Sequence, residues 1–163
     1  GMDEEGFSGR DGRTTIFDWW SVASIRRLRK LIASGKYRSS SVSELVENGL
    51  MKEEAELFLR FTEAIRFAAE DCSIRQGTTY DLCYCNMSSD GFDKNRHFVF
   101  LRDYEEHTLL IAANFSNREA VMKLVIPEHA FEWMGIPKTE ALHPGKVIEV
   151  KVQPMDGAIV TLI

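Results

Sequence analysis

Hydrophobic residues recur with a helical period through the first half of the chain. Between Asp18 and Gly35, apolar residues three or four positions apart alternate with arginine and lysine, which predicts an amphipathic helix that Gly35 ends. The segment Ser39–Asn48 has the pattern of a shorter second helix. The segment Glu53–Ser73 is the most strongly helical, since its apolar residues share one wide face: Phe58, Phe61, Ile65, Ala68, Ala69 and Cys72. A face of this width predicts that another surface covers it.

After Gly77 the apolar residues follow a period of two, which is typical of half-buried strands. Turn-forming residues separate the apolar runs, as in Ser88–Gly91 and His143–Gly145. The pattern predicts strands at Thr79–Cys85, His97–Arg102, Thr108–Phe115, Ala120–Ile126, Val147–Val152 and Ala158–Ile163. Short strands joined by short turns indicate an antiparallel sandwich or barrel.

The two patterns together predict an α+β protein, in which N-terminal helices pack on a C-terminal antiparallel β-sandwich. Residues 1–77 form the loop and helical segment, and residues 78–163 form the all-β domain. The length of 163 residues suits one ordinary domain or two small ones. Hydrophobic residues make up 44% and charged residues 28%, so a packed core is expected rather than disorder.

The charge distribution argues against nucleic acid and membrane partners. The net charge is -5, whereas binding to phosphate groups requires a basic face. The run from Arg26 to Arg38 holds six basic residues, which is either a nucleic-acid patch or a solvated helix face. The acidic segment Glu44–Glu63 follows and balances it, which favours the second interpretation. No apolar run approaches the roughly 18 residues that a membrane helix needs.

The cysteines and histidines predict neither a metal nor a cofactor. The three cysteines are odd in number, and their spacing does not match a zinc ribbon. Cys83 and Cys85 would lie on one face of a strand, so a metal site with His97 is one interpretation and burial as small apolar residues is the other. No histidine pair has metal-ligand spacing, and no glycine motif for phosphate binding is present.

The segment EEGFSGRDGRTTIFDWW, residues 4–20, combines acids, arginines and two adjacent tryptophans beside a glycine-rich loop. Exposed tryptophan faces stack on sugar rings, and Asp–Arg pairs hydrogen-bond to hydroxyl groups. The segment is therefore a candidate carbohydrate contact. The alternative is that Trp19 and Trp20 only begin the first amphipathic helix, with at least one of them in the core.

Four stretches resemble the C-terminal part of the α-amylase family of glycoside hydrolases. They are GRDGRTTIFDWW, the helical LFLRFTEAIRFAAED, RQGTTYDL, and the hairpin FVFLRDYEEHTLLIAANFSN. In that family a (β/α)8 barrel ends with a helix before a small all-β domain. The resemblance covers nearly all of the chain. It implies that residues 3–20 are similar to the loop after the eighth barrel strand, where Asp11, Arg13, Trp19 and Trp20 would contact an α-glucan in the intact enzyme.

The same resemblance implies that this chain by itself is not catalytic. The family uses a nucleophilic Asp, an acid/base Glu and a third Asp, which follow barrel strands upstream of any segment that matches here. A retaining glycosidase needs two carboxyl groups about 5 Å apart in a shaped site. No catalytic residue is therefore assigned, and the expected partner is the missing catalytic barrel. The expected role of the β-domain is structural.

Two other functions stay open at the level of the sequence. The all-β domain is a candidate starch- or maltooligosaccharide-binding module, with Trp133, Phe131 and Tyr104 as candidate contacts. A stand-alone helical regulatory or nucleic-acid-binding protein is the other. Without the barrel that the resemblance implies, the apolar face of Glu53–Ser73 would be exposed, which predicts self-association, most simply as a two-fold dimer through the helices.

Overall fold

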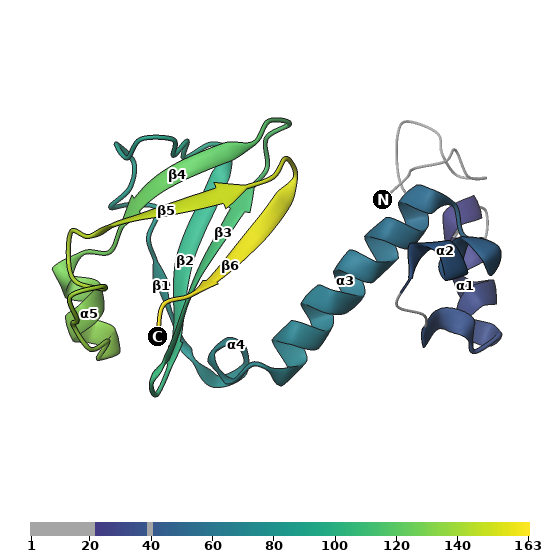
Figure 1. Ribbon diagram of the computed structural model, residues 1–163, viewed down its shortest axis with the longest axis horizontal. Helices are drawn as coiled ribbons and strands as arrows, with labels where there is room; N and C mark the ends of the chain where they lie inside the picture. The colour runs from purple at the N-terminus through teal and green to yellow at the C-terminus, as the bar shows by residue number, and fades with distance from the viewer. Residues whose placement is uncertain (1–21, 39–40) are drawn as a thin grey trace. The chain divides into compact units, whose positions relative to one another are not determined.

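The computed structural model describes residues 22–38 and 41–163 of the chain (Figure 1). Contacts between Cα atoms divide the chain into two compact units, Gly1–Phe67 and Ala68–Ile163, which we call unit 1 and unit 2. The long helix α3 (Lys52–Glu70) crosses this division. Each unit is described by itself.

The described part of unit 1 is helical. Helix α1 (Ala23–Ala33) is followed by the short 3-10 helix η3 (Lys36–Arg38), by α2 (Val42–Glu47) and by α3. The side chain of Ser41 accepts a hydrogen bond from the backbone N–H of Glu44 and so caps α2. A small core holds the helices together and consists of Leu31, Leu45, Leu50 and Ala55.

The helix predicted for Glu53–Ser73 is divided in two in the structure. Helix α3 ends at Glu70, and α4 (Cys72–Gln76) begins after Asp71, whose backbone is extended. The carboxylate of Asp71 accepts a hydrogen bond of 3.0 Å from the backbone N–H of Ile74. An N-cap interaction of this kind favours a new helix start over a continuous helix. The predicted helix is therefore correct in kind and wrong at its C-terminal end.

Unit 2 contains two antiparallel sheets and one further helix (Figure 1). The first sheet has the strand order β1-β2-β3-β6, and the second pairs β4 with β5. The helix α5 (Glu128–Met134) lies in the connection between β4 and β5. The strands are β1 (Thr78–Asp81), β2 (His97–Tyr104), β3 (His107–Asn114), β4 (Ala120–Val125), β5 (Val147–Val152) and β6 (Asp156–Thr161).

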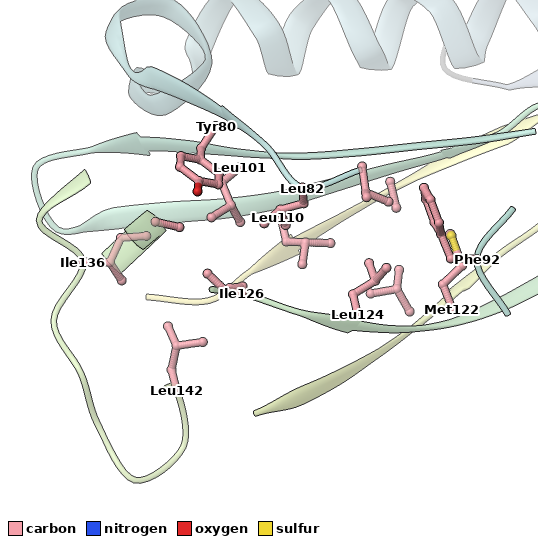
Figure 2. Close-up of a cluster of buried hydrophobic side chains, with 14 of the residues drawn as sticks. Tyr80, Leu82, Phe92, Leu101, Leu110, Met122, Leu124, Ile126, Ile136 and Leu142 are labelled. Carbon is pink, nitrogen blue, oxygen red and sulfur yellow. The ribbon is translucent and has the colours of Figure 1, made fainter. Parts of the chain in front are cut away.

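The two sheets share one hydrophobic core. Burial alternates along β2 and β4, as expected for strands with one face turned inward. Figure 2 shows Met122 and Leu124 of β4 on the side of the core opposite Leu110 of β3. Phe131 of α5 is also fully buried in this core, so α5 closes part of it.

The predicted α+β class is confirmed for the described residues, which form helices and antiparallel strands, although helix α5 lies inside the segment predicted to be all-β. The first strand is shorter than the predicted Thr79–Cys85, because the chain leaves β1 after Asp81. The carboxylate of Asp81 accepts a hydrogen bond of 2.7 Å from the backbone N–H of Cys83. This local side-chain bond forms a turn in competition with the strand ladder. Cys83 and Cys85 consequently lie in a turn rather than on one face of a strand.

Candidate functional site

The residues predicted to contact substrate, Asp11, Arg13, Trp19 and Trp20, lie outside the described residues. Two surfaces of the described part of the chain have the properties of binding sites. One is an apolar groove and stripe on the helices of unit 1, and the other is a group of aromatic side chains on unit 2.

The apolar groove lies between α1 and α3 and has a volume of about 330 Å³. An ion pair fixes the two helices beside it, with Arg27 Nε 2.9 Å from Glu54 Oε2. Hydrogen bonding to Arg27 lowers the pKa of the Glu54 carboxyl group, although partial burial opposes the shift. The apolar side chains among those that line the groove are Ile25, Leu28, Leu50, Leu57, Phe58 and Phe61.

An exposed apolar stripe runs along α3 from this groove. We call it the α3 stripe, and it consists of Leu57, Phe61 and Ile65, whose exposed fractions are 54%, 61% and 65%. Residues four positions apart lie on the same face of a helix. A contiguous apolar surface of this kind usually contacts another protein surface. Phe58, predicted to belong to this face, is half-buried instead and packs on the small core of unit 1.

The second surface, which we call the aromatic cluster, consists of Tyr80, Tyr84, His129 and Trp133. Tyr80 lies on β1, Tyr84 lies in the turn after β1, and the other two residues lie on α5. The ring centroid of Tyr80 is 6.2 Å from that of Tyr84, 5.8 Å from that of His129 and 5.9 Å from that of Trp133. Tyr80 is therefore the central ring of the cluster.

Exposure differs sharply within the aromatic cluster. Tyr80 is 7% exposed and points into the core, as Figure 2 shows. Tyr84 and Trp133 as whole residues are 52% and 56% exposed. Solvent-exposed aromatic faces on a buried aromatic support are available to a ligand without rearrangement of the core.

A chain of hydrogen bonds joins three members of the cluster. The hydroxyl groups of Tyr80 and Tyr84 are hydrogen-bonded to each other, and the Tyr80 hydroxyl group lies 3.0 Å from Nδ1 of His129. Burial raises the pKa of the Tyr80 phenol, and the neighbouring Tyr84 hydroxyl group raises it further. Tyr80 is therefore neutral at physiological pH, and its hydroxyl group both donates and accepts.

The structure separates the three aromatic residues proposed from the sequence as sugar contacts. Trp133 is exposed within the aromatic cluster, Phe131 is buried in the core, and Tyr104 is half-buried at the end of β2. Phe131 is therefore wrong as a surface contact, because it lies with Ala130 on the buried face of α5, whereas Trp133 lies on the exposed face. The sequence did not predict Tyr84 or His129 as site residues. The hydrogen bond that brings α5 to β1 joins Tyr80 and His129, which are 49 positions apart in the chain.

Cys83, Cys85 and His97, for which the sequence left a metal site open, form no metal site among the residues that the structure describes. No group of three or more His, Cys, Asp or Glu side chains is arranged there to hold a metal ion. The sulfur of Cys83 instead accepts a hydrogen bond of 3.3 Å from the backbone N–H of Val99, and burial raises the pKa of its thiol. His97 is buried, and its Nδ1 accepts a hydrogen bond of 3.0 Å from the backbone N–H of Asp93. These residues support the packing of unit 2.

Comparison with known proteins does not assign the chain to a family. Neither the scan against protein-family models nor the search of curated proteins finds a match to the chain. Within the described ranges, no helix is long and apolar enough to span a membrane.

Proposed function

We propose that this chain is a non-catalytic C-terminal part of an α-amylase-like glycoside hydrolase that acts on α-glucans. The observation that supports the proposal best is the α3 stripe, an exposed apolar helix face that precedes a unit with two antiparallel sheets in the chain. In the α-amylase family, the last barrel helix precedes the β-domain and packs on the barrel. The stripe is the surface that the missing barrel would cover.

The proposal interprets the two sheets of unit 2 as the family's C-terminal β-sandwich and the helices of unit 1 as the remnant of the barrel end. The shared core between the sheets supports this interpretation, since facing sheets with a common core are the defining property of a sandwich. The loop residues Asp11, Arg13, Trp19 and Trp20 would then contact substrate at the mouth of the intact barrel.

The role proposed for unit 2 is structural, and the contacts of α4 support it. Arg102 of β2 donates a hydrogen bond of 2.9 Å to the carbonyl oxygen of Ser73, and the Ser73 hydroxyl group donates to the carbonyl oxygen of His107. His107 also lies 3.0 Å from Asp71. The segment directly after α3 is thus attached to both β2 and β3. A sheet unit attached in this way would stabilise the last helix of a barrel.

The genomic reading frame that encodes this chain tests the proposal. We expect an upstream, in-frame sequence with barrel strands and the Asp, Glu and Asp motifs of the family. An upstream frame that encodes an unrelated fold would overturn the proposal.

A second test measures activity. The chain alone is expected to release no sugar from starch or maltodextrin, and no nitrophenol from nitrophenyl glucosides. Because contaminating amylases are common, the control is a mock purification from cells that lack the gene. Turnover that follows the protein through purification and is absent from the mock would contradict the proposal.

A second candidate function is binding of an α-glucan by unit 2 itself. The observation that favours it is the pair of exposed rings, Tyr84 and Trp133, on the buried Tyr80. The loop at residues 9–20 is not expected to bind sugar in the isolated chain. It would provide one wall of a cleft, and small ligands gain affinity mostly from enclosure. The loop is therefore expected to bind sugar with a Kd above about 1 mM.

A further inference from the structure

The aromatic cluster has the three properties that a neutral polyhydroxyl ligand requires. The first is accessible aromatic surface. The rings of Tyr84 and Trp133 both contact the ring of Tyr80, at centroid distances of 6.2 and 5.9 Å. The centroids of Tyr84 and Trp133 are therefore no farther apart than the sum of these two distances. A short oligosaccharide covers such a span. Each ring offers a flat apolar face, which matches the C–H faces of a pyranose ring.

The second property is a hydrogen-bond chain that can reverse its direction. When Tyr80 donates to Nδ1 of His129, Tyr84 donates to Tyr80, and Nε2–H of His129 is a donor for a ligand. When Nδ1–H of His129 donates instead, the Tyr84 hydroxyl group becomes the outward donor and Nε2 an acceptor. A sugar hydroxyl group both donates and accepts, so either direction of the chain provides it with a partner.

The third property is the lack of a cationic side chain for an anionic ligand. None of the four members is a lysine or an arginine, and the Tyr80 phenol, whose pKa burial raises, is a neutral hydrogen-bonding group. Phosphate and carboxylate groups are bound best by charged donors, whereas a neutral sugar needs only hydroxyl and imidazole partners.

We propose that the aromatic cluster is a binding site for an α-1,4-linked glucan chain. The choice of this linkage rests on the proposed function, whereas the choice of a neutral sugar rests on the cluster itself. The rings of Tyr84 and Trp133 stack on successive sugar units. The Tyr84 hydroxyl group and Nε2 of His129 bind sugar hydroxyl groups, and Tyr80 supports both rings from below.

The experiment is an NMR titration of the full-length chain with maltoheptaose, in which backbone and indole shifts are followed. Saturable shifts are expected in β1, in the turn after it and in α5, with a Kd of about 1 mM or below. Trp133→Ala and Tyr84→Ala are each expected to weaken binding by about fivefold or more. Phe115→Ala is the matched control, because Phe115 is a 64% exposed aromatic residue that belongs to no part of the cluster. It is expected to leave the Kd unchanged.

Three results would overturn the site. They are the absence of saturable shifts in the wild-type chain, equal binding by wild type and Trp133→Ala, and loss of binding in Trp19→Ala or Trp20→Ala. Native-like spectra outside the cluster show that each variant is folded. Cellohexaose tests the linkage, and binding as tight as that of maltoheptaose would overturn the α-1,4 assignment.

Failure of the site and failure of the proposed function are distinguishable. The genomic reading frame decides whether an amylase-like barrel precedes this chain, and it does not depend on any binding measurement. A frame without a barrel, combined with maltoheptaose shifts that Trp133→Ala removes, would overturn the proposed function and support the site.

Discussion

Asn114 shows how one buried amide can join the two sheets of unit 2. Its Nδ2 donates to the carbonyl oxygens of Arg118, Val152 and Gln153, at 2.8, 3.3 and 3.1 Å. Its Oδ1 accepts a hydrogen bond of 2.9 Å from the backbone N–H of Ser116. The side chain thus fixes the end of β3, the turn that follows and the end of β5.

Replacing Asn114 by alanine is expected to lower the free energy of unfolding by about 3 kcal/mol, since buried backbone groups lose their partners. Asn117→Ala is the control, because Asn117 is exposed in the same turn, and its effect is expected within about 0.5 kcal/mol. Urea unfolding followed by Trp133 fluorescence, with Trp19 and Trp20 replaced by phenylalanine, measures both. Equal free energies of unfolding for the two variants would refute the role of Asn114 in joining the two sheets.

His97 gives unit 2 a pH dependence with a defined sign. Burial lowers the pKa of its imidazole below the ordinary value of 6.5, so the folded protein resists protonation there. The unfolded chain takes up a proton near pH 6.5, and the stability contributed by neutral His97 is therefore present above that pH and lost as the pH falls.

The variant His97→Gln removes this titrating group. The difference in unfolding free energy between wild type and His97→Gln is expected to be larger at pH 7.5 than at pH 5.5 (about one unit above and below the histidine reference value). Urea unfolding at the two pH values measures it, and the other histidines cancel in the difference. A difference in unfolding free energy that is equal at the two pH values, or larger at pH 5.5, would contradict the lowered pKa of His97.

At the scale of elements, Gly91 determines how the long β1–β2 connection meets β4. Its φ is +77°, and a Cβ atom there would lie 1.8 Å from the carbonyl oxygen of Val121. The neighbouring Asp90 carbonyl oxygen accepts a hydrogen bond of 2.9 Å from the backbone N–H of Lys123. The connection therefore lies against β4 at a distance that only glycine permits.

Gly91→Ala is expected to cost about 4 kcal/mol or more, because both backbone strain and a steric clash oppose it. Gly145→Ala is a matched control. Its φ is +78°, yet no atom lies within 4 Å of the added Cβ. It is expected to cost about 1 kcal/mol from strain alone. Thermal unfolding by circular dichroism compares the two, and similar costs would show that the contact with β4 is unimportant.

The surface that covers the α3 stripe determines the oligomeric state of the whole molecule. Leu57, Phe61 and Ile65 are each more than half exposed, although they form one contiguous apolar face. In the proposed parent enzyme the barrel would cover this face. In the isolated chain, a second copy is the simplest available partner, and a two-fold dimer buries the same stripe on both copies.

The isolated chain is therefore expected to self-associate at high micromolar concentration. The double variant Phe61→Lys and Ile65→Lys is expected to be monomeric, because it places two like charges in the stripe. Glu63→Lys is the control, because Glu63 is an exposed residue of α3 outside the stripe. Light scattering across a concentration series measures the mass, and a wild-type monomer at the highest concentration would refute the prediction.

The sequence by itself determined the elements of this protein. The helical period identified α1 to α3, and the period of two identified β2 to β5 within one or two residues of their ends. These patterns are legible because burial of one face imposes a period on the residues of each element. Even the misplaced end of the first predicted strand has a local cause, the side-chain hydrogen bond of Asp81 that begins a turn.

Only the tertiary structure decided which faces are covered and which residues meet. The apolar face of the third helix looked uniform in the sequence, yet Phe58 is partly buried against the small core of unit 1, whereas Phe61 and Ile65 are exposed. The aromatic cluster depends on the approach of α5 to β1, which no local period encodes. Side-chain periodicity reports the environment of one element, whereas contacts between distant segments depend on how all the elements pack around their common core.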